Sequence, residues 1–440
     1  MRSSLFRSRR FWLAWLCLPP LLFTVGNCVD TTPSVAQGPV VLTPKGTGGH
    51  NDPSILTHPY VVLVSFDGFR SDYLDRFETP SFDRLARAGV RAEGLISVFP
   101  SLTFPGHYSI ATGLYPEHHG IVGNRFYDPV RADEFNYRDS DDARDGSWWG
   151  GEPIWVTAET QGMVAAAFFF PGTEAAIANI RPTDWRPYDA SVANADRVRQ
   201  VINWLTRPAD RRPHLVTLYF SLVDRAGHDL GPDTPGMSRA VEGADRLLGQ
   251  LMDGLNTLPH SKEVSLIVVS DHGMAPIDPE RQIVVRDLVD LKGVKAMATG
   301  PTMSLHVGDD QRSHLLRDTL NGQLVNARAY LRAEIPVHLH HRASQRIGDV
   351  VVIPDEGVQI RFQRDASPPA GMHGWDPTLP SMHGILLASG PRIRAGQRIP
   401  AVESVHVYPL IANLLDLVPN PNIDGDLNVL IGILKVPVLR

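Results

Sequence analysis

The stretch from Tyr60 to Gly68 reads YVVLVSFDG and begins the regular part of the chain. Its first seven residues are apolar or β-branched almost without interruption, which predicts a strand buried on both faces of a parallel sheet. The strand then ends at a carboxylate, Asp67, followed directly by a glycine. A buried strand that ends in a carboxylate recurs further along the chain, and this recurrence indicates both the fold and the place of the site.

Further strands and helices follow in alternation. Strands of the same kind are expected at residues 214–220 (HLVTLYF), 264–269 (VSLIVV) and 384–388 (GILLA), with helices at 238–255 and 408–417. This order predicts an α/β fold, a doubly wound and mostly parallel sheet with helices on both faces. We expect one catalytic domain over residues 58–440, with the less regular residues 281–370 forming a small inserted cap.

The N-terminal residues have the layout of an export signal. Arginines precede an apolar run from Phe11 to about Val25, which is short for a membrane span and is interrupted by prolines. We expect residues 1–29 to be a signal peptide, with no stable membrane span after its removal and a periplasmic or secreted product. An uncleaved anchor, a twin-arginine signal and a lipoprotein site at Cys28 are alternatives. Residues 30–57, rich in Pro, Gly, Thr and Ser, are expected to form a flexible linker.

Charge and cysteine content exclude several kinds of site. The formal net charge of −6 argues against a nucleic-acid-binding surface, although a bound metal ion would still allow an anionic substrate. Both cysteines, Cys17 and Cys28, lie in the expected signal peptide. A cysteine nucleophile, a thiolate zinc site and a structural disulfide are therefore excluded for the folded body.

Metal-binding residue types gather at the ends of the expected strands. Asp67 follows the first strand, Asp224 and His228 follow the second, and Asp271 and His272 follow the third. Ligands of open α/β sheets bind beyond the carboxyl ends of the strands, so these groups are expected to meet. Nitrogen and carboxylate ligands without thiolate suit zinc, and also manganese or iron. Two such ions would stabilise the attacking and leaving oxygens of a displacement at phosphorus.

The candidate nucleophile is Thr103, in the segment FPSLTFPGH at residues 99–107. The residues after it can run as a helix, and the N–H groups at a helix N-terminus favour an anion. Threonine is also a common helix cap, so the segment alone leaves both roles open. Contact with a metal would decide between them, because a free hydroxyl is a weak nucleophile at neutral pH.

Several segments carry a resemblance to a known family. They are VSFDGFR at 64–70, TFPGHY at 103–108, ATGLYPEHHGIVGN at 111–124, YFSLVDRAGHDLGP at 219–232, SDHGM at 270–274 and HGWD at 373–376. In content and order they resemble the nucleotide pyrophosphatase/phosphodiesterase family of the alkaline phosphatase superfamily. The chain departs from the family pattern at Leu102, a position that is often Lys, and at Gly106, which is often Asn. Both flank Thr103 and are expected to affect substrate preference.

The resemblance implies an alkaline-phosphatase-like fold and two Zn²⁺ per chain. One zinc would be held by Asp224, His228 and His373, and the other by Asp67, Asp271, His272 and the hydroxyl of Thr103. Asn124 and the backbone N–H of Thr103 would donate to a phosphate oxygen, and Phe104 and Tyr219 would flank the leaving group and stack on a base.

Two histidines are alternative candidates for the last metal ligand. His373 and His383 both precede glycine, and spacing alone does not separate them; the resemblance favours His373. His107 is expected to pack near the site without binding metal. The histidines of the segment PVHLHHR at 336–342 are expected to alternate along a strand of the cap.

The expected chemistry is a two-step hydrolysis. The Thr103 hydroxyl, its pKa lowered by zinc, would displace one ester group and form a phospho-threonine, which water would then hydrolyse. The expected substrates are small molecules, nucleotide diesters and nucleotide pyrophosphates, giving nucleoside monophosphates. A phosphomonoesterase of the same superfamily and a lipid or choline phosphodiesterase are alternatives, and an inactive envelope binding protein is a remote one. The sequence does not indicate an oligomeric state.

Overall fold

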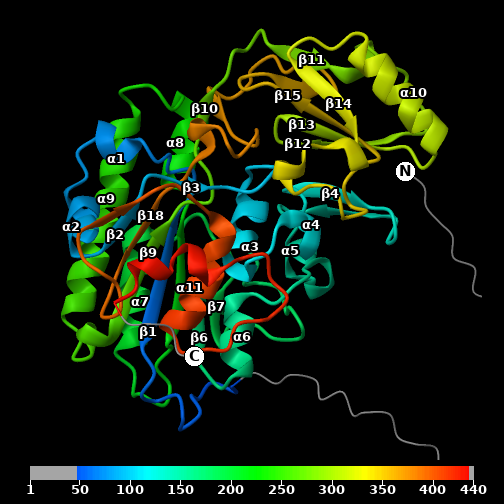
Figure 1. Cartoon of the computed structure of the whole chain (residues 1–440). Helices are drawn as coiled ribbons and strands as arrows, with labels where there is room; N and C mark the ends of the chain where they lie inside the picture. The colour runs from blue at the N-terminus through cyan, green and yellow to red at the C-terminus, as the bar shows by residue number, and fades with distance from the viewer. Residues whose placement is uncertain (1–46, 436–440) are drawn as a thin grey trace, which may run out of the picture. The chain divides into compact units, whose positions relative to one another are not determined.

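The computed structural model describes residues 47–435 (Figure 1). The expected signal peptide and the expected linker up to residue 46 lie outside the described residues. Residues 47–57 make specific contacts: Thr47 Oγ1 donates to Glu159 Oε2 at 2.8 Å, and the Asn51 amide donates to the carbonyls of Ala209 and Arg212. Contacts with the domain therefore begin before residue 58, inside the segment expected to be a linker.

An eight-stranded sheet forms the centre of the domain (Figure 1). Its order is β19 (Gln397–Ile399), β2 (Val90–Ala92), β18 (Leu386–Ser389), β9 (Val264–Val269), β1 (Tyr60–Phe66), β8 (Leu215–Phe220), β6 (Ala165–Phe168) and β7 (Asp184–Arg186). The strands from β9 to β7 are all parallel, whereas β18 runs antiparallel to both of its neighbours. The predicted α/β class with a mostly parallel sheet is confirmed.

Helices cover both faces of this sheet. The side chains of Val62 and Val64 in β1 pack into a core with residues of α1 (Tyr73–Arg76), α2 (Pro80–Ala88), α7 (Asn194–Leu205) and α9 (Met237–Asn256). Val61 and Leu63 belong instead to a core with α3 (Thr103–Thr112), α6 (Ile154–Thr160) and α11 (Val407–Leu414). Successive residues of β1 thus point into different cores, which is why the strand is apolar throughout.

A smaller sheet lies within the residues expected to form a cap. It contains β12 (Lys295–Thr299), β13 (Thr302–His306), β15 (Val350–Pro354) and β14 (Ala327–Leu331), all antiparallel, and α10 (Asp310–Asn321) packs on it. Beside it β11 (Gln282–Val284) pairs with β16 (Gln359–Arg361). These elements share an apolar core of their own, which includes Val285, Met303, Leu320 and Val350.

The prediction of a strand at residues 336–342 is wrong. Val337–Leu339 form a short 3-10 helix, and His340 has a left-handed backbone with φ of 44°. Each histidine has a different partner: His338 pairs with Asp376 at 2.8 Å, His340 stacks on Tyr115, and His341 is buried against Phe99. Contacts with separate parts of the domain therefore override the alternation in the sequence.

The buried His341 should make the protein sensitive to acid. Burial lowers the pKa of its imidazole to about 3, below the ordinary value of 6.5. As the pH falls below 6.5 the unfolded chain takes up a proton that the folded chain does not, so folding stability falls, by about 2 kcal/mol at pH 5. We expect His341→Leu to make the dependence of unfolding free energy on pH less steep between 6.5 and 4, measured by denaturant titration in chelator; the buried His119, His214 and His306, whose pKa values are also lowered, should keep part of the slope.

His314→Leu is the matched control, because His314 lies on α10 and its side chain is 48% exposed. It should keep the wild-type dependence on pH. A His341→Leu protein with the same pH dependence as wild type would show that His341 is not held neutral in the fold.

Candidate active site

The residues at the strand ends meet at one edge of the sheet, as expected. Asp67 follows β1, Asp271 and His272 follow β9, and α8 (Leu222–Leu230) carries Asp224 directly after β8. These three strands are neighbours in the order β9, β1, β8, so their carboxyl ends lie side by side. The turn after Asp67 needs glycine: Gly68 has φ of 66°, and a Cβ there would lie 2.7 Å from the Cα of Asp224.

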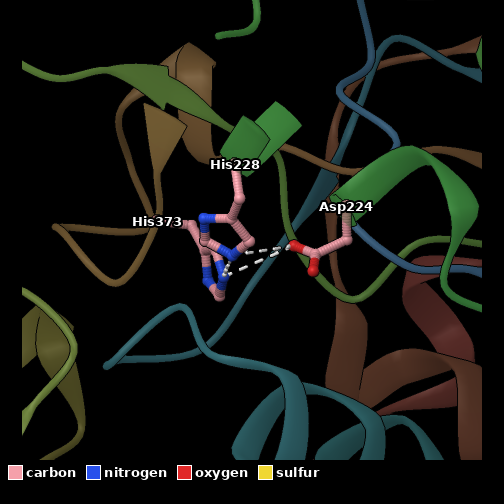
Figure 2. Close-up of side chains that lie close together, drawn as sticks. All are labelled: Asp224, His228 and His373. Carbon is pink, nitrogen blue, oxygen red and sulfur yellow. Dashed lines mark hydrogen bonds and ion pairs between the residues drawn. The ribbon is translucent and has the colours of Figure 1, made fainter. Parts of the chain in front are cut away.

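Asp224, His228 and His373 form the first group of candidate metal ligands (Figure 2). Asp224 and His228 are four residues apart on α8 and so share one face. His373 comes from the loop after β17 (Gly371–Met372). The Nε2 atoms of His228 and His373 lie 3.4 Å and 3.5 Å from Asp224 Oδ1, and 3.3 Å from each other. All three ligand atoms therefore point at one small volume.

Asp67, Asp271 and His272 form the second group, and Thr103 lies beside it. His272 Nε2 is 3.3 Å from Asp67 Oδ1, 3.1 Å from Asp271 Oδ2 and 3.4 Å from Thr103 Oγ1. The rings of His272 and His373 stack with centroids 3.5 Å apart, so the two groups adjoin. His383, the alternative to His373, belongs to neither group of the described residues.

Hydrogen bonds orient all three histidines in the same way. The Nδ1 atoms of His228, His373 and His272 contact the carbonyl oxygens of Gly371, Ser101 and Gly273 at 2.8, 2.8 and 2.9 Å. A carbonyl oxygen only accepts, so each Nδ1 carries the proton and each Nε2 keeps a free lone pair. This is how proteins hold histidines that bind metals.

The buried carboxylates fit bound cations. Among residues 47–435, Asp67, Asp224 and Asp271 each have one carboxylate oxygen that is buried and accepts no hydrogen bond. Burial, with the charges of Asp271 and Asp224, raises the pKa of Asp67 well above its ordinary range, and burial also raises the pKa of Asp224. Clustered buried carboxylates are costly unless a cation neutralises them. Oxygen and nitrogen donors in two adjoining groups fit divalent metals, zinc among them.

Thr103 is the first residue of α3, and it does not act as the cap. The N-cap position is Leu102, and no side chain makes a capping hydrogen bond there. The Thr103 hydroxyl faces His272 instead. Nearby, Asn124 Oδ1 accepts a hydrogen bond of 2.9 Å from the backbone N–H of Phe104, which turns the amide so that its Nδ2 remains as the donor.

A cavity of about 540 Å³ opens on this centre, and its lining includes Thr103, Phe104, Tyr188 and Tyr219. Tyr219 is only 7% exposed, and its hydroxyl donates to Asp67 Oδ2 at 2.5 Å, so it holds a candidate ligand in place. Tyr188 is 46% exposed, so its ring is more accessible to a ligand in the cavity. Sequence reasoning missed Tyr188, whose only signal is a single aromatic in a polar loop.

His107 contacts both the first turn of α3 and a candidate metal ligand. Its Nδ1 lies 2.8 Å from the Thr103 carbonyl and 3.1 Å from Asp271 Oδ2, and its Nε2 lies 2.8 Å from Ser65 Oγ. The ring is fully buried. It therefore joins the first turn of α3 to a candidate metal ligand.

Residues 61–376 match the family model described as type I phosphodiesterase/nucleotide pyrophosphatase. The chain belongs to this family. A pyrophosphatase/phosphodiesterase of Schizosaccharomyces pombe is 33% identical, over 87% of this chain and 82% of its own length. A bis(5'-adenosyl)-triphosphatase of Xenopus laevis is 35% identical, over 84% of this chain and 81% of its own. This type I phosphodiesterase is a hydrolase, as its relatives are.

Solved structures agree with the fold. Murine ectonucleotide pyrophosphatase/phosphodiesterase 5 aligns with a TM-score of 0.81 and 33% identity, covering 86% of this chain and all of that one. An inactive variant of the same murine protein was solved in complex with AMP. In the described part of this phosphodiesterase, residues 47–435, no helix is both long and apolar enough to cross a membrane.

Proposed function

We propose that this phosphodiesterase hydrolyses nucleotide diesters and nucleotide pyrophosphates to nucleoside monophosphates, with Thr103 as the nucleophile. The observation that carries the proposal is the position of the Thr103 hydroxyl, 3.4 Å from His272 Nε2 at the edge of a buried ligand group with a second group beside it. The AMP bound to the murine relative supports a nucleotide as the substrate.

The two ligand groups would hold two zinc ions. Asp224, His228 and His373 would bind one, and Asp67, Asp271 and His272 would bind the other together with Thr103 Oγ1. Bound zinc would supply the positive charge that lowers the pKa of the hydroxyl, stabilises the leaving oxygen and activates water. Tyr219 and His107 would keep Asp67 and Asp271 oriented.

The residues of the chain then carry out two displacements. After losing its proton, Thr103 Oγ1 forms a bond to phosphorus, and the bond from phosphorus to the leaving oxygen breaks with its electron pair. Asn124 Nδ2 and the Thr103 N–H donate to a phosphate oxygen as its charge grows. Water next attacks the phospho-threonine, and the bond from phosphorus to Oγ1 breaks to restore the hydroxyl. Phe104 and Tyr188 would hold the base on the two sides of its ring.

Export is also proposed, and it rests on the sequence alone. The arginines and the short apolar run of residues 1–29 support a signal peptide and a periplasmic or secreted enzyme. Cell fractionation with detection of the mature N-terminus tests it. An intact N-terminus in the cytoplasm would contradict it.

A diester should be a better substrate than a monoester. The nucleotide diester has a base that can stack on Phe104 and Tyr188, whereas p-nitrophenyl phosphate has none. We expect kcat/KM for the p-nitrophenyl ester of thymidine monophosphate to exceed that for p-nitrophenyl phosphate by at least about 100-fold.

The alternatives give different results in the same assay. A faster reaction with p-nitrophenyl phosphate would favour the phosphomonoesterase. Glycerophosphocholine as the best substrate would favour the choline phosphodiesterase. Purified protein without zinc that hydrolyses none of the three, even after zinc is added, would favour a binding protein.

A further inference from the structure

A second, smaller cavity of about 320 Å³ adjoins the one that contains Thr103, and we call it the side cavity. It is lined by Asn124, Arg125, Asn136, Tyr137, Arg138, Ala298, Thr299 and Gly300. Tyr137 and Arg138 line both cavities. The two cavities therefore adjoin at this short segment; Thr103 lines the larger one and Asn124 lines the side cavity.

The side cavity lies between the catalytic domain and the cap sheet. One wall is the hairpin of β4 (Arg125–Asp128) and β5 (Asp133–Asn136) with the two residues after it, and the other is the end of β12 with Gly300 in the turn to β13. A Cβ on Gly300 in this turn would lie 3.4 Å from the carbonyl oxygen of His373, and one on Gly123 would lie 2.6 Å from Thr299 Cγ2. The turn thus packs beside His373 and beside the residue preceding Asn124.

This position is the leaving-group side of the proposed reaction. Thr103 stands at the group of Asp67, Asp271 and His272. An in-line displacement places the leaving oxygen opposite the nucleophile, toward the other metal group, to which His373 belongs. A group attached to the leaving oxygen would therefore extend toward the side cavity.

The chemistry of the side cavity suits an anion. Its lining supplies two guanidinium groups and two carboxamides, with no Asp or Glu. Arg138 Nε donates to the Tyr137 hydroxyl at 2.9 Å, and no carboxylate of residues 47–435 forms an ion pair with Arg138. Arg125 Nη2 lies 3.7 Å from Glu134 Oε2, too far for a hydrogen bond, and Lys295 pairs with the same carboxylate. Guanidinium groups in such a setting recognise phosphate oxygens.

We propose that the side cavity binds the phosphate groups of the leaving group through Arg125 and Arg138. This inference rests on the proposed function and specifies the preferred substrates within it. Nucleotide pyrophosphates and nucleoside polyphosphates are preferred over diesters whose leaving group is uncharged. The base of the substrate lies in the larger cavity, which Phe104 and Tyr188 line. The bond that breaks joins the phosphorus attacked by Thr103 to the bridging oxygen, which departs with its electron pair as part of the phosphate chain held in the side cavity.

The test compares two substrates that share one nucleoside. ATP has a pyrophosphate leaving group, and the p-nitrophenyl ester of AMP has a leaving group without phosphate. For Arg125→Met and for Arg138→Met in the zinc-loaded full chain, we expect the ratio of kcat/KM for ATP to kcat/KM for the ester to fall about tenfold. Added salt should lower this ratio more in wild type than in a variant that carries both Arg125→Met and Arg138→Met.

Arg199→Met is the control of equal charge, because Arg199 lies on α7 with a side chain 70% exposed, and it lines neither cavity. Its ratio should equal that of wild type. Equal losses on both substrates in the Arg125 and Arg138 variants, or no change in the ratio, would overturn the side-cavity assignment. A zinc-loaded wild type that hydrolyses neither substrate would instead contradict the proposed function.

Discussion

Thr103→Ala should lower kcat/KM for the p-nitrophenyl ester of AMP by about 10⁴-fold or more. The substitution removes the only atom of this residue that can bond to phosphorus. The first turn of α3 should survive, because the Thr103 side chain makes no capping hydrogen bond and its carbonyl contact with His107 is a backbone contact. The protein should therefore keep its fold and most of its zinc, measured by circular dichroism and metal analysis.

Thr103→Ser is the matched control. It keeps the hydroxyl next to His272 and removes only a methyl group, so it should retain activity within about tenfold of wild type. If zinc-replete Thr103→Ala protein kept substantial activity, Thr103 would not be the nucleophile, and water would have to attack phosphorus directly.

His373→Ala should remove a metal ion from each chain and most of the activity. His373 provides one of the three ligand atoms that meet at Asp224 Oδ1, and its Nδ1 is already committed to the Ser101 carbonyl. Loss of one of three ligands should lower the zinc content by about one ion per chain and kcat by about 10³-fold. Metal analysis after dialysis and a steady-state assay measure the two effects.

His383→Ala is the control for this substitution. His383 also precedes a glycine, but it lies outside both ligand groups of the described residues, with its Nε2 buried and without a hydrogen bond among them. It should keep the zinc and the turnover of wild type, at some cost in stability. The opposite pattern, zinc lost from the His383 variant and kept by the His373 variant, would reverse the ligand assignment.

The sheet and the convergence of its strand ends were predictable because they depend on local patterns. An apolar run such as residues 60–66 specifies a strand buried on both faces, and a parallel sheet brings the carboxyl ends of such strands to one edge. Asp67, Asp224 and Asp271 follow their strands within a few residues, so their meeting needs no knowledge of distant contacts.

The parts that sequence patterns do not specify depend on long-range contacts. His373 reaches the site because β17 pairs with β10 (Ala275–Pro276), the strand just after Asp271 and His272; Met372 lies opposite Ala275. The spacing of residues along the chain does not predict that β10 and β17 pair. The histidines at 338–341 are likewise placed by separate distant partners.

Ring orientation is a second property that the pattern of residues does not contain. Tyr219 was expected to stack on the substrate, but it is buried with its hydroxyl on Asp67, and the exposed ring in the cavity belongs to Tyr188. A tyrosine serves as a stacking surface or as a hydrogen-bond donor according to what surrounds it. The strand that carries Tyr219 places the residue at the site, but it does not determine whether the ring stacks on a ligand or the hydroxyl donates a hydrogen bond.

The stereochemical course at phosphorus is the most direct measurement of the proposed mechanism. A nucleotide ester made chiral at phosphorus with sulfur would be hydrolysed in water enriched in heavy oxygen, and the configuration of the product would be determined by phosphorus NMR. Attack by Thr103 followed by attack of water gives two in-line displacements, each of which inverts phosphorus, so we predict net retention of configuration. Net inversion would mean a single attack by water and would contradict a phospho-threonine intermediate.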